Sequence, residues 1–297
     1  MAFDKLIGNE KIKSLLEKSI SSKNILHSYL FTGIEGIGKK EFANEFAKMI
    51  LCMGQNSPCG SCKSCMQFES NNHPDYIMID SEDKKIKIEQ IRYLQEKISE
   101  KPITSDRKVY IINDSDTMTK EAQNCLLKTL EEPPEYATLI LICSNENKLL
   151  NTIRSRCIKI SFSKIEDEQI EDYLRKNKNM IINKELLSMC LGSIATAINV
   201  CENKEQYLEV DKVVENITKK DLVEVLNNAE ILYKAKEDIQ ELLNYMNVLL
   251  YNQGKINCIK YVEEAKKRIL SNSNYDMTID YLLIKIWEEV NEKYSRC

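Results

Sequence analysis

Four cysteines lie close together between residues 52 and 65, with the spacing Cys-x6-Cys-x2-Cys-x2-Cys. Pro58, Gly60 and Ser61 bend the chain among them. Closely spaced thiolates on turns can close a tetrahedral zinc site, and four cysteines leave no coordination position open for catalysis. An iron–sulfur cluster and redox-active thiols are the chemical alternatives. We predict a structural zinc site whose ligands are Cys52, Cys59, Cys62 and Cys65, with Cys52 the least certain of the four. His73 lies close by, but a lone histidine in a loop is more typical of a surface or turn residue than of a ligand.

A glycine-rich segment earlier in the chain has the pattern of a phosphate-binding loop. It reads Gly33-Ile34-Glu35-Gly36-Ile37-Gly38-Lys39-Lys40 and lies between a strand-like and a helix-like stretch. In such a loop the small residues let backbone N–H groups surround phosphate oxygens, and the lysine adds a positive charge. The alternative is a plain glycine-rich turn. The pattern favours a phosphate loop, at Gly33, Gly36, Gly38, Lys39 and Lys40, and leaves open whether ATP still binds there.

The two positions that would hold magnesium in such a loop protein both carry unsuitable residues. A hydroxyl should follow the loop lysine, but Lys40 stands there. An acidic residue should follow a strand, but the stretch Val109 to Ile112 is followed by Asn113 and Asp114. An amide at Asn113 cannot supply the negative charge that the metal needs. We therefore do not expect this chain to hydrolyse ATP by itself.

The first half of the chain alternates strand-like and helix-like stretches. Apolar residues at helical spacing occur at 12–20, 42–50, 88–98 and 122–130, and strand-like runs at 26–31, 76–79, 109–112, 139–143 and 158–162. Pro133 and Pro134 end the last of these helices. Strands that alternate with helices indicate an α/β domain, with a parallel sheet flanked by helices.

The second half reads as helix throughout. The chain has only 8 Gly and 5 Pro in 297 residues, the last Pro is Pro134, and Gly192 and Gly254 are the only glycines after Glu166. So few turn residues argue against an all-β fold and favour long helices. Other cysteines of the chain are expected to act as small core residues.

Composition narrows the class of function. A net charge of −4 excludes a strongly basic nucleic-acid coat protein, though not a local basic face. The longest uncharged apolar run, Ala137 to Ser144, is too short to span a bilayer, so no membrane partner is expected. Asp4 and Lys5 stand where a secretion signal would be apolar, which favours a cytoplasmic protein.

Two further motifs, together with the loop and the cysteines, resemble a known family. These are Leu126-Leu127-Lys128-Thr129-Leu130-Glu131-Glu132-Pro133-Pro134 and Ser155-Arg156-Cys157. The chain resembles the bacterial DNA polymerase III clamp loader, an AAA+ family whose subunits share an ATPase-like domain, a helical lid and a helical collar. In that family the arginine of the Ser-Arg-Cys motif reaches into the ATP site of the neighbouring subunit. The resemblance therefore implies that Arg156 acts on the ATP site of the neighbouring subunit. The alternative is that Arg156 is a cation near the C-terminus of a helix, where the helix dipole favours positive charge.

Departures from the family pattern indicate which kind of subunit this is. Motor (gamma/tau) subunits would carry Thr or Ser at Lys40, Asp-Glu at Asn113-Asp114 and an arginine shortly after Gly192. The loss of these elements, with Arg156 kept, looks like a subunit that gives an arginine finger without hydrolysing ATP. Ser144 and Asn145 match the family's sensor position. An active motor subunit, and a zinc-bearing adaptor unrelated to replication, remain the alternatives.

The resemblance also implies partners and a domain plan. The partners would be the motor (gamma/tau) subunits, the delta subunit, the sliding clamp and primer-template DNA held without sequence readout, all in a hetero-oligomer. The expected domains are an AAA+ ATPase-like domain at 1–163, a helical lid at 164–207 and a helical collar at 208–297.

Overall fold

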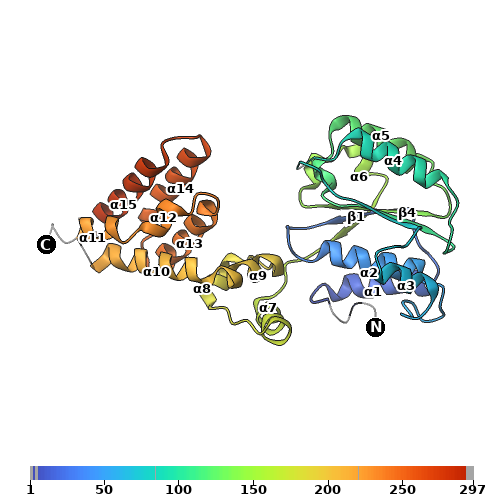
Figure 1. Cartoon of the computed structure of the whole chain (residues 1–297), viewed down its shortest axis with the longest axis horizontal. Helices are drawn as coiled ribbons and strands as arrows, with labels where there is room; N and C mark the ends of the chain where they lie inside the picture. Colours follow the sequence, from blue (N-terminus) through green and yellow to red (C-terminus); the bar gives the residue numbers. More distant parts are fainter. Residues whose placement is uncertain (1–2, 4–5, 84, 220, 292–297) are drawn as a thin grey trace. The chain divides into compact units, whose positions relative to one another are not determined.

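A computed structural model describes residues 3, 6–83, 85–219 and 221–291 of the chain (Figure 1). The chain divides into two units. The first comprises residues 1–173 and 192–195, and the second comprises residues 174–191 and 196–297. The three domains expected from the sequence are not distinguished by this division and remain a prediction.

The first unit is built on a five-stranded parallel sheet with the strand order β2-β3-β4-β1-β5. Its strands are β1 (Ser28–Thr32), β2 (Tyr76–Ile79), β3 (Lys108–Ile112), β4 (Ala137–Cys143) and β5 (Ile158–Ser161). The register pairs Leu30 of β1 with Leu141 of β4 and with Lys159 of β5. The three central strands are buried on both faces, which explains their near-continuous apolar sequences.

Helices cover both faces of this sheet (Figure 1). The α-helices of the unit are α1 (Glu10–Ser21), α2 (Lys39–Leu51), α3 (Lys63–Glu69), α4 (Ile88–Ser99), α5 (Lys120–Glu131), α6 (Asn151–Arg154) and α7 (Asp167–Tyr173). Short 3-10 turns lie at η1 (Ser115–Thr117) and η2 (Glu146–Lys148). The predicted α/β fold, a parallel sheet flanked by helices, is confirmed.

Side chains that alternate along each strand feed two separate cores. Tyr29 and Phe31 of β1 pack with α1 and α2 in one core, and Leu30 packs with α4, α5 and α6 in the other. This alternation follows from the two-residue period of a strand. The two cores hold the sheet between its helices and so fix the loops that follow the strands. The candidate site lies on those loops.

Helices are the regular elements of the second unit, and its described residues form no strand. It contains η3 (Leu174–Lys178), α8 (Lys184–Met189), most of α9 (Ile194–Glu202), α10 (Lys204–Lys219), α11 (Leu222–Asn227), α12 (Glu230–Lys234), α13 (Ile239–Asn252), α14 (Ile256–Leu270) and α15 (Tyr275–Asn291). Buried Leu242, Met246 and Leu282 belong to the interior formed where α10, α13, α14 and α15 pack. The helical second half expected from the sequence is confirmed. Among the described residues, no helix has the length and apolar character needed to cross a membrane.

Candidate functional site

The glycine-rich loop lies between β1 and α2, as predicted. Gly38 precedes the first turn of α2 with a φ of 93°, and Lys39 is the first residue of the helix. The positive end of the helix dipole therefore faces the loop, which is the arrangement that favours a bound anion.

The loop lysine is held by the loop itself. The Lys39 ammonium donates hydrogen bonds to the carbonyls of Gly33 and Ile34, both at 2.7 Å, and to the Ser144 hydroxyl at 3.4 Å. Burial lowers the pKa of Lys39, against the opposing effect of nearby acidic groups. Its donors are directed to backbone carbonyls in this structure, so a phosphate would have to displace those bonds.

The segment Gly192–Ala195 packs directly on the loop. The backbone N–H of Ala195 donates to the carbonyl of Gly36 at 3.1 Å. A Cβ atom added at Gly36 would lie 2.4 Å from the Ser193 hydroxyl and 2.8 Å from the Ala195 Cβ. Because both contacts are too short for real atoms, only glycine fits at this position. This segment therefore covers one side of the loop.

The residues at the two expected magnesium positions, Lys40 and Asn113, meet at one carboxylate. The Lys40 ammonium lies 3.2 Å from both oxygens of Asp80, which follows β2. The Asn113 amide nitrogen donates to Asp80 at 2.8 Å and to Asp114 at 3.1 Å. Sequence reasoning missed Asp80. Its signal was an acidic residue directly after the strand next to β3, because adjacent parallel strands end at the same edge.

Arg156 lies on the surface of the first unit between α6 and β5. Its guanidinium forms an ion pair with Glu131 at 2.8 Å and donates to the Thr152 carbonyl at 2.9 Å. The side chain is 34% exposed. Glu131 belongs to the Leu-Glu-Glu-Pro-Pro motif, so the structure brings together the two motifs that carry the family resemblance.

The four predicted ligand cysteines converge. Their sulfur atoms all lie within 4.8 Å of one another, and those of Cys59 and Cys65 are 4.0 Å apart. Tetrahedral zinc with Zn–S bonds of about 2.3 Å places its sulfurs about 3.8 Å apart. The geometry therefore includes Cys52 and fits a four-cysteine metal site.

Backbone donors prepare these cysteines for the thiolate state. The N–H groups of Gly54 and Cys59 donate to the Cys52 sulfur, both at 3.3 Å. A Cβ at Gly54 would lie 2.8 Å from the Cys59 sulfur, which explains the glycine. The N–H groups of Ser61 and Cys62 lower the pKa of Cys59 to about 6, whereas burial raises that of Cys65 to about 12. A bound cation would offset this cost of ionising Cys65.

His73 is buried, which corrects the expectation of a plain surface or turn residue. Its Nδ1 accepts from the N–H of Asp75 at 3.0 Å, so its Nε2 carries the proton. That nitrogen lies 2.9 Å from the Ser64 hydroxyl and 3.3 Å from the Ser105 hydroxyl, and both hydroxyls donate to the carbonyl of Leu51.

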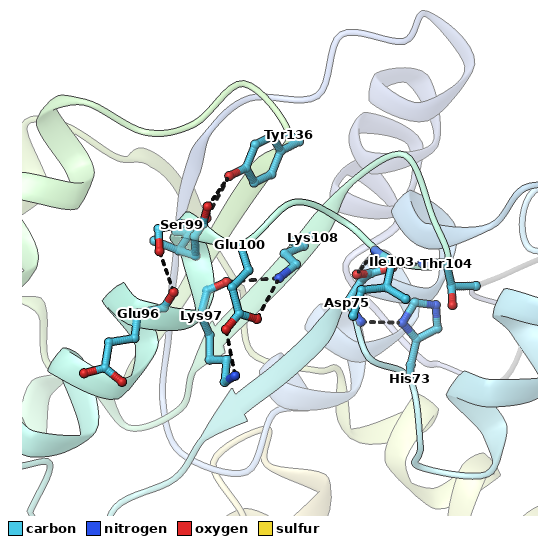
Figure 2. Close-up of polar contacts among 11 residues, drawn as sticks. His73, Asp75, Glu96, Lys97, Ser99, Glu100, Ile103, Thr104, Lys108 and Tyr136 are labelled. Carbon is cyan, nitrogen blue, oxygen red and sulfur yellow. Dashed lines mark hydrogen bonds and ion pairs between the residues drawn. The ribbon is translucent and has the colours of Figure 1, made fainter.

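This network anchors the cysteine module to the sheet. Leu51 precedes Cys52 and Ser64 precedes Cys65, so His73 holds the chain beside two of the four cysteines. Asp75, beside it, accepts three backbone hydrogen bonds from residues 103–105. Figure 2 shows Asp75 next to His73 and to Ile103 and Thr104. In the same view, Lys108 donates to the carbonyl of Lys97 at 3.0 Å, which ties β3 to the end of α4.

The remaining cysteines follow the prediction only in part. Those that are buried are Cys143, Cys157, Cys190 and Cys258. Cys125 and Cys201 are only partly buried, and Cys125 packs against the core formed with α4 and α5. Cys297 lies outside the described residues.

The sheet order, the strand–glycine loop–helix unit and the helical second unit define the AAA+ class of proteins. The chain belongs to the family described as "DNA polymerase III, delta subunit", which matches residues 8–166. It is 31% identical to the DNA polymerase III subunit delta' of Bacillus subtilis, over 94% of this chain and 96% of the relative. The predicted membership of the clamp-loader family, and the resemblance to its delta-prime subunit, are confirmed.

Subunits named tau and gamma are also similar to this chain, some over nearly all of it and others over a shorter stretch. The DNA polymerase III subunit tau/gamma of Haemophilus influenzae is 36% identical over 58% of this chain, which spans about a quarter, 25%, of that relative. A solved structure, a gamma subunit-related protein of Thermotoga maritima, covers 95% of this chain with a TM-score of 0.50 at 17% identity. At that identity the likeness shows the shared fold alone.

Proposed function

We propose that this chain is a non-hydrolysing subunit of the DNA polymerase III clamp loader, which supplies Arg156 to the ATP site of a neighbouring subunit and helps to load the sliding clamp onto primed DNA. The observation that carries the proposal is the contrast between two sites of one unit. Its own loop lysine is engaged by loop carbonyls, while Arg156 presents a partly exposed guanidinium held by Glu131.

The chemistry of phosphoryl transfer supports this division of labour. Hydrolysis needs a metal ion held near the phosphates and a residue that orients the attacking water. Lys40 supplies an ammonium where an oxygen ligand is needed, and Asn113 supplies an uncharged amide whose nitrogen faces Asp80 and Asp114. An arginine from a neighbour, in contrast, needs only a rigid support and an accessible surface. Arg156 has both.

The proposed partners follow from the relatives. Subunits named delta', tau and gamma of DNA polymerase III are similar to this chain. We propose a hetero-oligomer with motor (gamma/tau) and delta subunits that acts on the sliding clamp and primer-template DNA. ATP would act on the assembly, because a ligand shifts a conformational equilibrium only by binding its states differently.

The isolated chain tests the non-hydrolysing role. We expect purified protein to release no phosphate from ATP above the background, and Lys39→Ala to behave identically, because the metal positions are defective. The measurement is ATP binding and phosphate release with and without DNA. Hydrolysis that Lys39→Ala abolishes would support the competing function, an active gamma/tau-type motor, which the similarity to tau/gamma subunits favours.

We also propose that the four cysteines hold structural zinc. The support is the fit of the sulfur separations to a tetrahedral ion and the N–H donors directed at the sulfurs. With four protein ligands the ion would have no open position, so its role would be to fix the turn between α2 and α3.

His73 should affect zinc retention by holding the chain beside the cysteines, not as a ligand. We expect His73→Ala to release zinc to a chelator about tenfold faster, because outer partners of metal ligands typically change metal affinity by 10–100-fold. The matched control is His27→Ala, since His27 is the other histidine of the chain and is exposed. Equal zinc loss from both variants, or from neither, would contradict this role.

A further inference from the structure

The Lys40 side chain is placed where an ion would be needed. It rises from the first turn of α2, and its ammonium lies 3.2 Å from both oxygens of Asp80, at the end of β2. In phosphate-loop ATPases the residue after the loop lysine and an acidic residue at a strand end hold the metal. Here the equivalent positions, Lys40 and Asn113, both donate hydrogen bonds to that one carboxylate.

The orientation of Asn113 is fixed by its neighbours. Its amide nitrogen lies 2.8 Å from Asp80 and 3.1 Å from Asp114. Ionised carboxylates only accept hydrogen bonds, so the amide presents its nitrogen to both. A magnesium ion takes about six oxygen ligands in an octahedron, several of them waters, and is held by one or two carboxylates. The Lys40 ammonium lies against both oxygens of Asp80 and therefore occupies the place that such an ion would take.

The carboxylates around this site nevertheless favour a cation. Burial raises the pKa of Asp114, and the carboxylates of Asp116, Glu35 and Asp80 raise it further, while Lys40 opposes them. The other nearby cation, Lys39, directs its ammonium to loop carbonyls and Ser144. Lys40 is thus the cation paired directly with a carboxylate at this place.

We propose that the Lys40 ammonium is the resident cation of this site and replaces a divalent ion in balancing Asp80, so that the folded site is independent of magnesium. The inference rests on the proposed non-hydrolysing role. Its test reads stability and not turnover, so the two proposals can fail separately.

The test is thermal unfolding of the full chain with millimolar MgCl2, against NaCl of equal ionic strength. The wild-type melting temperature should be the same in both salts. Lys40→Ala should melt about 1–4 °C lower, as expected for a half-exposed ion pair, and MgCl2 should restore most of that loss. Lys40→Ala combined with Asp80→Asn should not respond to MgCl2. Lys40→Met keeps the apolar part of the side chain but not its charge, so it should also be less stable in NaCl.

Lys159→Ala is the matched control, because the Lys159–Glu146 ion pair is similarly exposed and lies in the same unit. It should lose comparable stability without any recovery in MgCl2. A wild-type protein stabilised by MgCl2 as strongly as Lys40→Ala would overturn the inference. So would a Lys40→Ala protein that ignores MgCl2, or a control that recovers equally.

Discussion

Replacing Arg156 with alanine is expected to lower the DNA-stimulated ATP turnover of a reconstituted clamp loader by about tenfold or more, with the assembly intact. Arginine fingers stabilise the charge that develops on the transferring phosphoryl group and contribute about 10³–10⁵ in rate at the site they serve. Subunits that keep their own arginines would continue to work, so the loss for the whole complex is smaller. The measurements are phosphate release with primed DNA and co-elution of the subunits.

Two variants separate the charge from the fold. Arg156→Lys keeps the charge but loses the planar donor pair, so it should recover only a small part of the turnover. Arg154→Ala removes a nearby arginine outside the Ser-Arg-Cys motif and should leave turnover close to wild type. If Arg156→Ala assembles and turns over normally, the trans role is wrong. If it fails to assemble, Arg156 is an interface residue instead.

The fold was predictable because local patterns and global topology agree. The stretch Tyr76 to Ile79 was predicted as a strand, and the structure has β2 with the same bounds. The stretch Val109 to Ile112 was also predicted as a strand, and β3 extends it by one residue, Lys108. Strands buried on both faces produce continuous apolar runs, and the apolar residues of an amphipathic helix recur about every 3.6 residues. Both signals can be recognised in a single sequence.

The site was predictable where it depends on residue type and not where it depends on tertiary packing. Cysteine spacing identified the four converging sulfurs, because the ligands are close in sequence. Asp80 was missed because it meets Lys40 only where the end of β2 lies beside the start of α2. His73 was misjudged because its burial depends on Ser64 and Ser105, which come from separate segments.

Loss of a predicted zinc ligand is expected to have a large effect on metal content and stability. Cys65→Ser should leave less than stoichiometric zinc in the purified protein and lower the stability of the first unit by about 3–5 kcal/mol. Structural zinc contributes directly to folding free energy, as much as about 10–16 kcal/mol in small peptides. The loss here should be smaller, because α2 is already packed on the sheet through Phe42 and Phe46. The measurements are metal content, expected at about one zinc per chain in wild type, and thermal unfolding.

Cysteine controls determine whether metal or packing causes the loss. Cys143→Ser also changes a buried cysteine, but one on β4 away from the cluster, so it should lose some stability and keep its zinc. Cys52→Ser should lose zinc as Cys65→Ser does, because the Cys52 sulfur lies among the other three despite its longer gap in sequence. Full zinc retention by Cys52→Ser would remove it from the ligand set. A coloured, iron-containing wild-type protein would instead show that the four thiolates hold a cluster, since zinc has no visible absorption of its own.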